Sequence, residues 1–146
     1  MPDASSRPRR RVAVLTCMDA RIDPLTLLGL ERGDAHIVRN AGGLVTDDAV
    51  RSLSVSQRLL GTDEVVVVMH EGCGLCGASD EQYARELGAD GATPTWALGG
   101  FEDLERALRA GLARLRSSPE LVAREQIRGL IFDPASGRLR ALDDDG

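Results

Sequence analysis

The sequence is poor in aromatic residues, in cysteine and in long apolar runs. Phe, Tyr and Trp together make up 3% of its 146 residues, so the core must be built from Val, Leu, Ile and Ala. No apolar run approaches the roughly 18–20 residues that a membrane-spanning helix needs. The net charge is −5, which argues against a nucleic acid as the main partner. We therefore expect neither membrane insertion nor nucleic-acid binding.

Cysteine is scarce and odd in number, with Cys17, Cys73 and Cys76 as the full set. The basic N-terminal stretch is followed by a short apolar run, 12–18, that ends in charged residues. A secretory signal needs a longer apolar region and a small-residue cleavage site. We therefore expect a cytoplasmic protein. In that compartment three cysteines indicate metal binding or catalysis rather than a disulfide framework.

Length and composition fit one globular domain. Hydrophobic residues make up 42% of the chain and charged residues 28%, which is ordinary for a folded protein. We expect residues 1–10 to form a flexible N-terminal tail and residues 11–142 a single domain. Residues 143–146 should form a solvated acidic tail.

Apolar runs alternate with amphipathic stretches along the chain. We predict strands over 11–16, 35–38, 64–69, 127–132 and 138–142. Helices are predicted over 23–29, 46–60, 79–87 and 101–115, with a short helical turn over 118–125. The run of four valines at 65–68 lacks alternation, which is typical of a central parallel strand buried on both faces. The fold class is α/β, with a mainly parallel central sheet of four strands, an antiparallel edge strand and flanking helices.

Two groups of reactive side chains follow two of the predicted strands, CMDAR at 17–21 and HEGCG at 70–74. Because ligands bind at the carboxyl ends of parallel strands, we expect the two groups to converge at one sheet edge. Cys17, His70 and Cys73 would supply two thiolates and one imidazole, which are three zinc ligands. A three-ligand site leaves the fourth position open, as in catalytic rather than structural zinc. The pattern therefore predicts a catalytic zinc centre.

These motifs, taken in order, resemble those of the β-class carbonic anhydrases, in particular the smaller bacterial and archaeal-like members. The shared segments are CMDAR at 17–21, VRNAGG at 38–43, VRSL at 50–53 and HxxCG at 70–74. A weaker likeness runs through GLIFDPASGRL at 129–139. The similarity is strongest between about Arg11 and Gly77.

The resemblance implies that Zn²⁺ is the cofactor and that Cys17, His70 and Cys73 bind it. It implies reversible hydration of carbon dioxide to bicarbonate and a proton, through zinc-bound hydroxide. A zinc-bound water has a pKa of about 7 in the unrelated three-histidine carbonic anhydrases. Thiolate ligands place more negative charge on the metal than imidazoles do, so we expect activity to favour higher pH here.

The resemblance also implies roles outside the metal ligands. Asp19 and Arg21 match the catalytic Asp–Arg dyad of the family, in which the carboxylate either orients the zinc-bound oxygen or becomes a fourth ligand. The backbone amide of Gly74 would contact the bound substrate. The family forms homodimers, or higher oligomers built from dimers, with the active site near the subunit boundary.

Two alternatives stay open. Hydrolases of carbon disulfide or carbonyl sulfide look similar to the smaller β-class members and have the same ligands. In addition, Cys73-Gly-Leu-Cys76 has the spacing of zinc knuckles, so a closed, non-catalytic Cys3His module is the second alternative. For Cys76 itself we favour a buried thiol.

Other polar and apolar side chains have less specific predictions. We expect a structural role for His36, and hydrogen bonds from Arg39 and Asn40 that fix the loop after the second strand. Four apolar residues could line a carbon dioxide pocket or be plain core: Val45, Val50, Leu53 and Leu75.

Overall fold

Five strands form one mixed sheet in the part of the chain that the structure, a computed structural model, describes: residues 5–88 and 93–143. The strands are β1 (Val12–Cys17), β2 (Ala35–Asn40), β3 (Glu64–His70), β4 (Ile127–Asp133) and β5 (Arg138–Ala141). Their order across the sheet is β2-β1-β3-β4-β5. The first four are parallel and β5 pairs antiparallel with β4, so the predicted fold class is confirmed.

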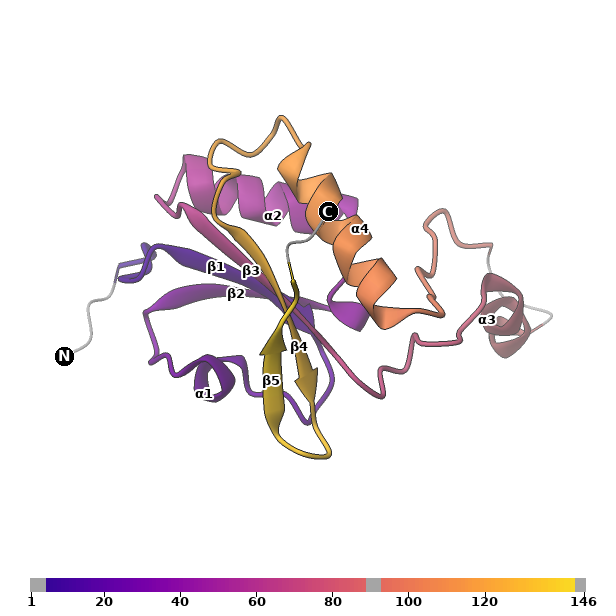
Figure 1. Cartoon of the computed structure of the whole chain (residues 1–146). Helices are drawn as coiled ribbons and strands as arrows, with labels where there is room; N and C mark the ends of the chain where they lie inside the picture. Colours follow the sequence, from indigo (N-terminus) through magenta and orange to yellow (C-terminus); the bar gives the residue numbers. More distant parts are fainter. Residues whose placement is uncertain (1–4, 89–92, 144–146) are drawn as a thin grey trace.

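Two helices, α2 (Asp47–Arg58) and α4 (Leu104–Arg116), cover one face of this sheet (Figure 1). The hydrophobic core lies between them and the sheet. Helix α2 begins at Thr46, whose hydroxyl accepts a hydrogen bond from the Ala49 N–H at 3.1 Å. Its inner face buries Val50 and Leu53, so these two residues belong to the core. Leu108 of α4 packs from the other helix and is fully buried.

A short helix, α1 (Pro24–Leu28), lies on the opposite side of the sheet from α2 and α4 (Figure 1). Pro24 occupies the first turn, as predicted, and Gly29 ends the helix with a φ of 67°. Within the described residues, no helix is long and apolar enough to cross a membrane.

Helix α3 (Asp80–Leu87) extends away from the sheet (Figure 1). It lies in the segment that leaves the body of the protein after Gly77 and returns at Phe101, which we call the arm. None of its residues is buried, and Tyr83 contacts Trp96 with ring centroids 5.9 Å apart. The two ends of the arm, which we call its foot, are hydrogen-bonded: the Gly77 N–H donates to the Phe101 carbonyl at 2.7 Å. The two chain segments therefore lie side by side where the arm leaves the body.

The predicted helical turn over 118–125 is wrong beyond its first residues. The chain makes one turn, closed by a bond from the Leu121 N–H to the Ser118 carbonyl, and then runs irregularly to β4. The Gln57 side chain of α2 bonds this segment instead: its Oε1 accepts from the N–H groups of Val122 and Ala123, and its Nε2 donates to the Ala123 carbonyl. Because a distant side chain satisfies these backbone groups, no helix is needed there.

The segment predicted as an N-terminal tail makes hydrogen bonds to the rest of the protein through its last residues, Arg9 and Arg10. The backbone N–H groups of Arg9 and Arg10 donate to the carbonyls of Gly33 and Asp34 at 2.9 Å each. The Arg9 guanidinium also bonds the Asp34 carboxylate, which is 8% exposed. Residues 1–4 and 144–146 lie outside the described residues. The domain boundaries themselves stay a prediction.

Candidate metal centre

Three side chains meet at the carboxyl edge of the sheet. Cys17 and His70 are the last residues of β1 and β3, and Cys73 follows β3. The two sulfur atoms and one imidazole nitrogen all lie within 4.8 Å of one another, and all three residues are buried. The parallel register pairs β1 directly with β3, so the two strands end side by side. This pairing brings together residues that are far apart in the sequence.

The His70 ring is oriented by its own backbone neighbourhood. Its Nδ1 donates to the Glu71 carbonyl at 2.9 Å, which leaves Nε2 as the free nitrogen. Among the described residues, Nε2 of His70 is the only buried side-chain nitrogen or oxygen without a hydrogen-bond partner. A buried nitrogen without a partner costs free energy unless something binds it. Together with two thiols, this donor set fits a zinc ion.

Contacts from β2 and from the loop after it hold the Cys17 side of the site. The Gly42 N–H donates to the Cys17 sulfur at 3.3 Å, and Arg39 donates to the carbonyls of Cys17 and Asp19, each at 2.9 Å. Arg39 makes structural hydrogen bonds as predicted, but they fix the segment at the end of β1 and after it rather than the loop after β2. Gly43 has a φ of 65°, and a Cβ there would lie 3.0–3.2 Å from backbone atoms of neighbouring strands. Only glycine fits such a close approach without a shift.

Asn40 and His36 also take the structural roles predicted for them. The Asn40 side chain donates to the Leu44 carbonyl and accepts from the Leu44 N–H, which closes the loop. The His36 ring bonds the Ser56 hydroxyl at 2.6 Å and the Ser6 carbonyl at 2.7 Å. His36 therefore connects β2 to α2 and to the N-terminal segment.

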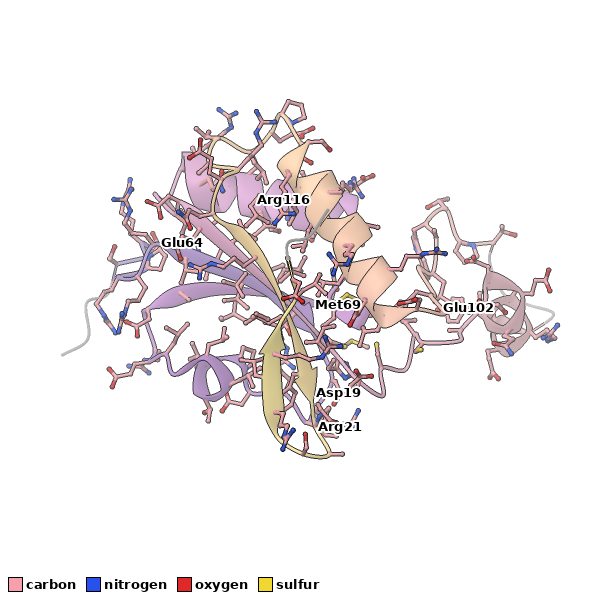
Figure 2. The ribbon with its side chains drawn as sticks, in the orientation of Figure 1. Asp19, Arg21, Glu64, Met69, Glu102 and Arg116 are labelled. Carbon is pink, nitrogen blue, oxygen red and sulfur yellow. The ribbon has the colours of Figure 1, made fainter. Side chains whose placement is uncertain are left out.

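Asp19 and Arg21 form a two-bond ion pair beside the cluster. Arg21 Nε donates to Asp19 Oδ1 at 3.0 Å and Nη2 donates to Oδ2 at 2.8 Å, while the Arg21 backbone N–H also donates to Oδ1. Asp19 Oδ2 lies 3.8 Å from His70 Nε2. Figure 2 shows the pair at the opposite end of the sheet from Glu64, where β3 begins. The carboxylate therefore lies next to the unpartnered nitrogen.

Local bonding sets the charge states around the cluster. Hydrogen bonds from the Arg21 side chain hold the pKa of Asp19 well below its usual range, so the carboxylate is ionised. The same pair raises the pKa of Arg21. Burial raises the pKa of the Cys73 thiol. A metal would have to displace that proton, which couples metal affinity to pH.

Apolar side chains surround the cluster, and most of them were not singled out from the sequence. Ile22 is buried with Cys17 and Cys73, and a further four partly buried side chains pack on this group: Leu27, Leu75, Phe101 and Phe132. Leu75 is thus at the site rather than in the main core. Phe101 and Phe132 come from distant parts of the chain, and no local pattern marks them.

Gly74 lies next to the cluster in an open position. A Cβ built on Gly74 meets no heavy atom within 4 Å, and the residue is exposed. The space beside its backbone is therefore free for a small molecule.

Cys76 is not part of the metal-ligand cluster and is not buried, so the predicted buried thiol is wrong. Its side chain is exposed, and its sulfur donates to the Glu102 carbonyl at 3.8 Å. The chain turns outward into the arm at this position, which exposes the side chain. Among the described residues, only Cys17, His70 and Cys73 form a group that could hold a metal ion. This arrangement disfavours a closed Cys3His site.

Comparison with known proteins identifies the architecture. The family model described as carbonic anhydrase matches residues 12–128. Beta-carbonic anhydrase 1 of Mycobacterium tuberculosis is 40% identical over 136 residues, which cover 92% of this chain and 83% of that protein. The chain belongs to the β-carbonic anhydrase family. Members of this family are zinc enzymes, so Zn²⁺ is the cofactor that the cluster of Cys17, His70 and Cys73 is suited to bind.

Two further relatives show how broad the family is. The crystal structure of carbonic anhydrase from Streptococcus mutans superposes with a TM-score of 0.87 at 41% identity and covers 94% of this chain and 84% of that chain. A carbon disulfide hydrolase from Acidianus is 36% identical over 158 residues, covering 90% of this chain and 76% of that protein. The β-carbonic anhydrase fold therefore occurs in relatives named for different substrates.

Proposed function

We propose that this chain catalyses the reversible hydration of carbon dioxide to bicarbonate and a proton, as a zinc lyase. The observation that carries the proposal is the unpartnered His70 Nε2, which lies among two buried thiols and 3.8 Å from Asp19 Oδ2. Family membership and the carbonic anhydrase names of the relatives support it.

Cys17, His70 and Cys73 would hold the zinc ion. When bound, zinc supplies a Lewis acid that makes a water molecule acidic enough to act as a nucleophile near neutral pH. The apolar side chains around the cluster, which include Ile22 and Leu75, form a wall that suits an uncharged, nonpolar substrate such as carbon dioxide. Exclusion of bulk water by this wall also strengthens charge interactions inside the site.

Asp19 would orient the attacking oxygen. Both of its carboxylate oxygens accept bonds from Arg21, which fixes the direction of the remaining lone pairs. The ionised carboxylate can accept a hydrogen bond from the attacking oxygen at Oδ2 and so aim a lone pair of that oxygen at the carbon. While Arg21 holds both oxygens, Asp19 is kept from becoming a fourth ligand. The Gly74 N–H would donate to an oxygen of the bound substrate.

We also propose that the protein works in the cytoplasm as a homodimer, or as a higher oligomer built from dimers. The family resemblance supports an active site near a subunit boundary. Exposure of Gly74 beside the buried ligands is consistent with a site that opens toward a partner.

Stopped-flow carbon dioxide hydration by the zinc-loaded protein tests the proposed activity. We expect clear activity that rises from neutral to mildly alkaline pH. Cys17→Ala should reduce it more than 100-fold, because loss of a residue that merely orients a ligand already costs about 10- to 100-fold. Cys76→Ala is the matched control, since it also removes one thiol but lies outside the cluster. Equal activity of wild type and Cys17→Ala would refute the proposal.

Hydrolysis of carbon disulfide is the second candidate, and the 36% identity to a carbon disulfide hydrolase favours testing it. In this reaction one carbon disulfide and two waters give carbon dioxide and two molecules of hydrogen sulfide. Detection of hydrogen sulfide at a rate above that of carbon dioxide hydration, with both lost in Cys17→Ala, would move the assignment to this substrate.

A further inference from the structure

Cys76 and Cys73 lie at the two ends of one hydrogen-bonded turn. The Cys76 N–H donates to the Cys73 carbonyl at 3.0 Å. A turn closed in this way brings its first and last Cα atoms within about 7 Å of each other. A disulfide spans Cα atoms about 4.4–6.8 Å apart. Gly74 lies inside the turn and has open space around it, so the turn can adjust without a steric clash. The backbone therefore permits a disulfide between the two residues.

The two thiols differ in access. Cys73 is 6% exposed and belongs to the metal-ligand cluster, whereas Cys76 is exposed and lies outside that cluster. The Cys76 sulfur contacts the Glu102 carbonyl at the foot of the arm, where Figure 2 labels Glu102. A bulky reagent in solution would therefore meet Cys76 first. Cys73 would be reached only from inside the chain.

The backbone around Cys76 is held in place. Gly77 and Phe101 form a hydrogen bond of 2.7 Å, and the Phe101 N–H donates to the Leu75 carbonyl at 3.2 Å. Cys76 also pairs with Phe101 in a short parallel bridge. These bonds hold Cys76 against Phe101, and the bond from the Cys76 N–H to the Cys73 carbonyl keeps the two cysteines adjacent. The reaction of one with the other therefore has a high effective concentration.

From these contacts we propose that Cys76 is a thiol–disulfide exchange site that controls zinc binding. A small disulfide reacts at Cys76, and the resulting Cys73–Cys76 disulfide removes Cys73 from the metal site. The proposal rests on the proposed function in one respect, because it takes Cys73 as a zinc ligand.

The thiol–disulfide exchange takes place in two steps. The Cys76 thiolate attacks one sulfur of the small disulfide, the S–S bond breaks, and one small thiolate leaves. The Cys73 thiolate then attacks the Cys76 sulfur, the mixed disulfide breaks, and the second small thiolate leaves. The two protein thiols lose two electrons, and the small disulfide gains them. The Cys76 proton is taken up by one of the thiolates that leave. Cys73 has no proton while it holds zinc, so the second leaving thiolate takes its proton from water as the zinc ion is released.

The expected consequence is loss of the metal. After oxidation only Cys17 and His70 remain as ligands, and catalytic zinc sites use three protein ligands. Reduction by a thiol would return Cys73 to the site and allow zinc to bind again. The chain would therefore lose and regain its proposed activity with the redox state of its surroundings.

Oxidised glutathione, added to the zinc-loaded protein, tests the inference. Zinc is counted before the addition, and its release is then followed with a chromogenic chelator. Intact mass is measured without reductant. We expect wild type to release close to one zinc per chain, to lose the mass of two hydrogens and to carry no retained glutathione. Added thiol reductant should restore zinc binding.

Cys76→Ser is the matched variant, since it changes one sulfur to oxygen at an exposed position. It should keep its zinc under the same treatment and form no internal disulfide. A glutathione adduct that persists on Cys76 with zinc retained would overturn the inference. So would a disulfide between two chains, or zinc release from Cys76→Ser at the wild-type rate. A protein that holds no zinc before the addition would instead refute the proposed function, which keeps the two failures distinct.

Discussion

Two aspartates at opposite ends of the sheet are each held by an arginine. At the carboxyl end Arg21 bonds both oxygens of Asp19, and at the amino end Arg9 bonds Asp34. The pKa of each carboxyl group is lowered. The causes differ in order: the Arg21 side chain leads at Asp19, whereas a backbone hydrogen bond from Glu31 leads at Asp34. By charge state alone the two groups look alike.

The groups next to each carboxylate distinguish Asp19 from Asp34. Asp19 Oδ2 faces the unpartnered His70 Nε2 at 3.8 Å. Asp34 instead accepts from the Glu31 N–H at 2.8 Å and joins β2 to the segment before β1. A lowered pKa therefore does not identify a catalytic carboxylate. An unsatisfied partner nearby is the stronger indication, because a structural ion pair satisfies its own groups.

Asp19→Asn should give the largest effect. The amide keeps the shape of the side chain but loses the charge, and it can no longer act only as an acceptor. We expect kcat for carbon dioxide hydration to fall roughly 100-fold or more, in the range typical of a lost acid–base or orienting group. Zinc content should stay at the wild-type level, measured by metal analysis. A kcat within about 2-fold of wild type would remove Asp19 from the mechanism.

Arg21→Lys should give a smaller loss, about 10-fold in kcat. Lysine keeps the positive charge but cannot donate two parallel bonds to the carboxylate. Asp19 would then be held less firmly, and the Arg21 contact to the Gly72 carbonyl would also be lost. Steady-state kinetics check the result. Arg51→Lys is the matched control, because Arg51 makes an exposed ion pair with Asp48 on α2.

Asp34→Asn should show the reverse pattern. We expect kcat to equal that of wild type and the melting temperature to fall by roughly 3–6 °C, because the bonds from Arg9 and Glu31 lose their charged acceptor. Calorimetry and the carbon dioxide assay, run on the same samples, would check both parts. A loss of activity without a change in melting temperature would contradict the structural role.

The smallest effect is the pH dependence of that stability difference. The folded-state pKa of Asp34 lies below the unfolded value of about 3.9, so its contribution is complete above that value. The contribution is lost as pH falls through the folded pKa. The melting temperatures of wild type and Asp34→Asn should therefore differ most near neutral pH and converge in acid. Both proteins are measured without metal, since acid itself displaces zinc from thiolates.

The ligand set could be predicted because the sequence carries it locally. Cys17 and His70 each end an apolar run, and the parallel sheet brings such ends to one edge. The mainly parallel sheet followed from the alternation of helices and strands, and the central place of β3 followed from the valine run at 65–68. Local pattern and the general geometry of parallel sheets were sufficient for the ligands. Asp19 and Arg21 were singled out because they match the dyad of the family that the sequence resembles. The structure pairs them beside the cluster, and their catalytic role stays a prediction.

Features that depend on distant contacts could not be predicted. Asp34 drew no attention because its partner Arg9 comes from a segment interpreted as a tail. The irregular segment after Leu121 depends on the side chain of Gln57 in α2. Cys76 was interpreted as buried because the sequence does not show that the chain turns outward there. Each miss concerns a contact or an exposure that tertiary structure alone determines.

The closed foot of the arm has a consequence for how the chain can vary. The hydrogen bond between Gly77 and Phe101 holds the two ends of the arm next to each other. The entropic cost of closing a loop grows only slowly with the number of residues in it. The arm is therefore a position where relatives can lengthen, shorten or exchange a segment without moving the residues at the sheet edge. Sequence changes within the arm can therefore alter the outer surface of the protein without changing the metal-ligand cluster.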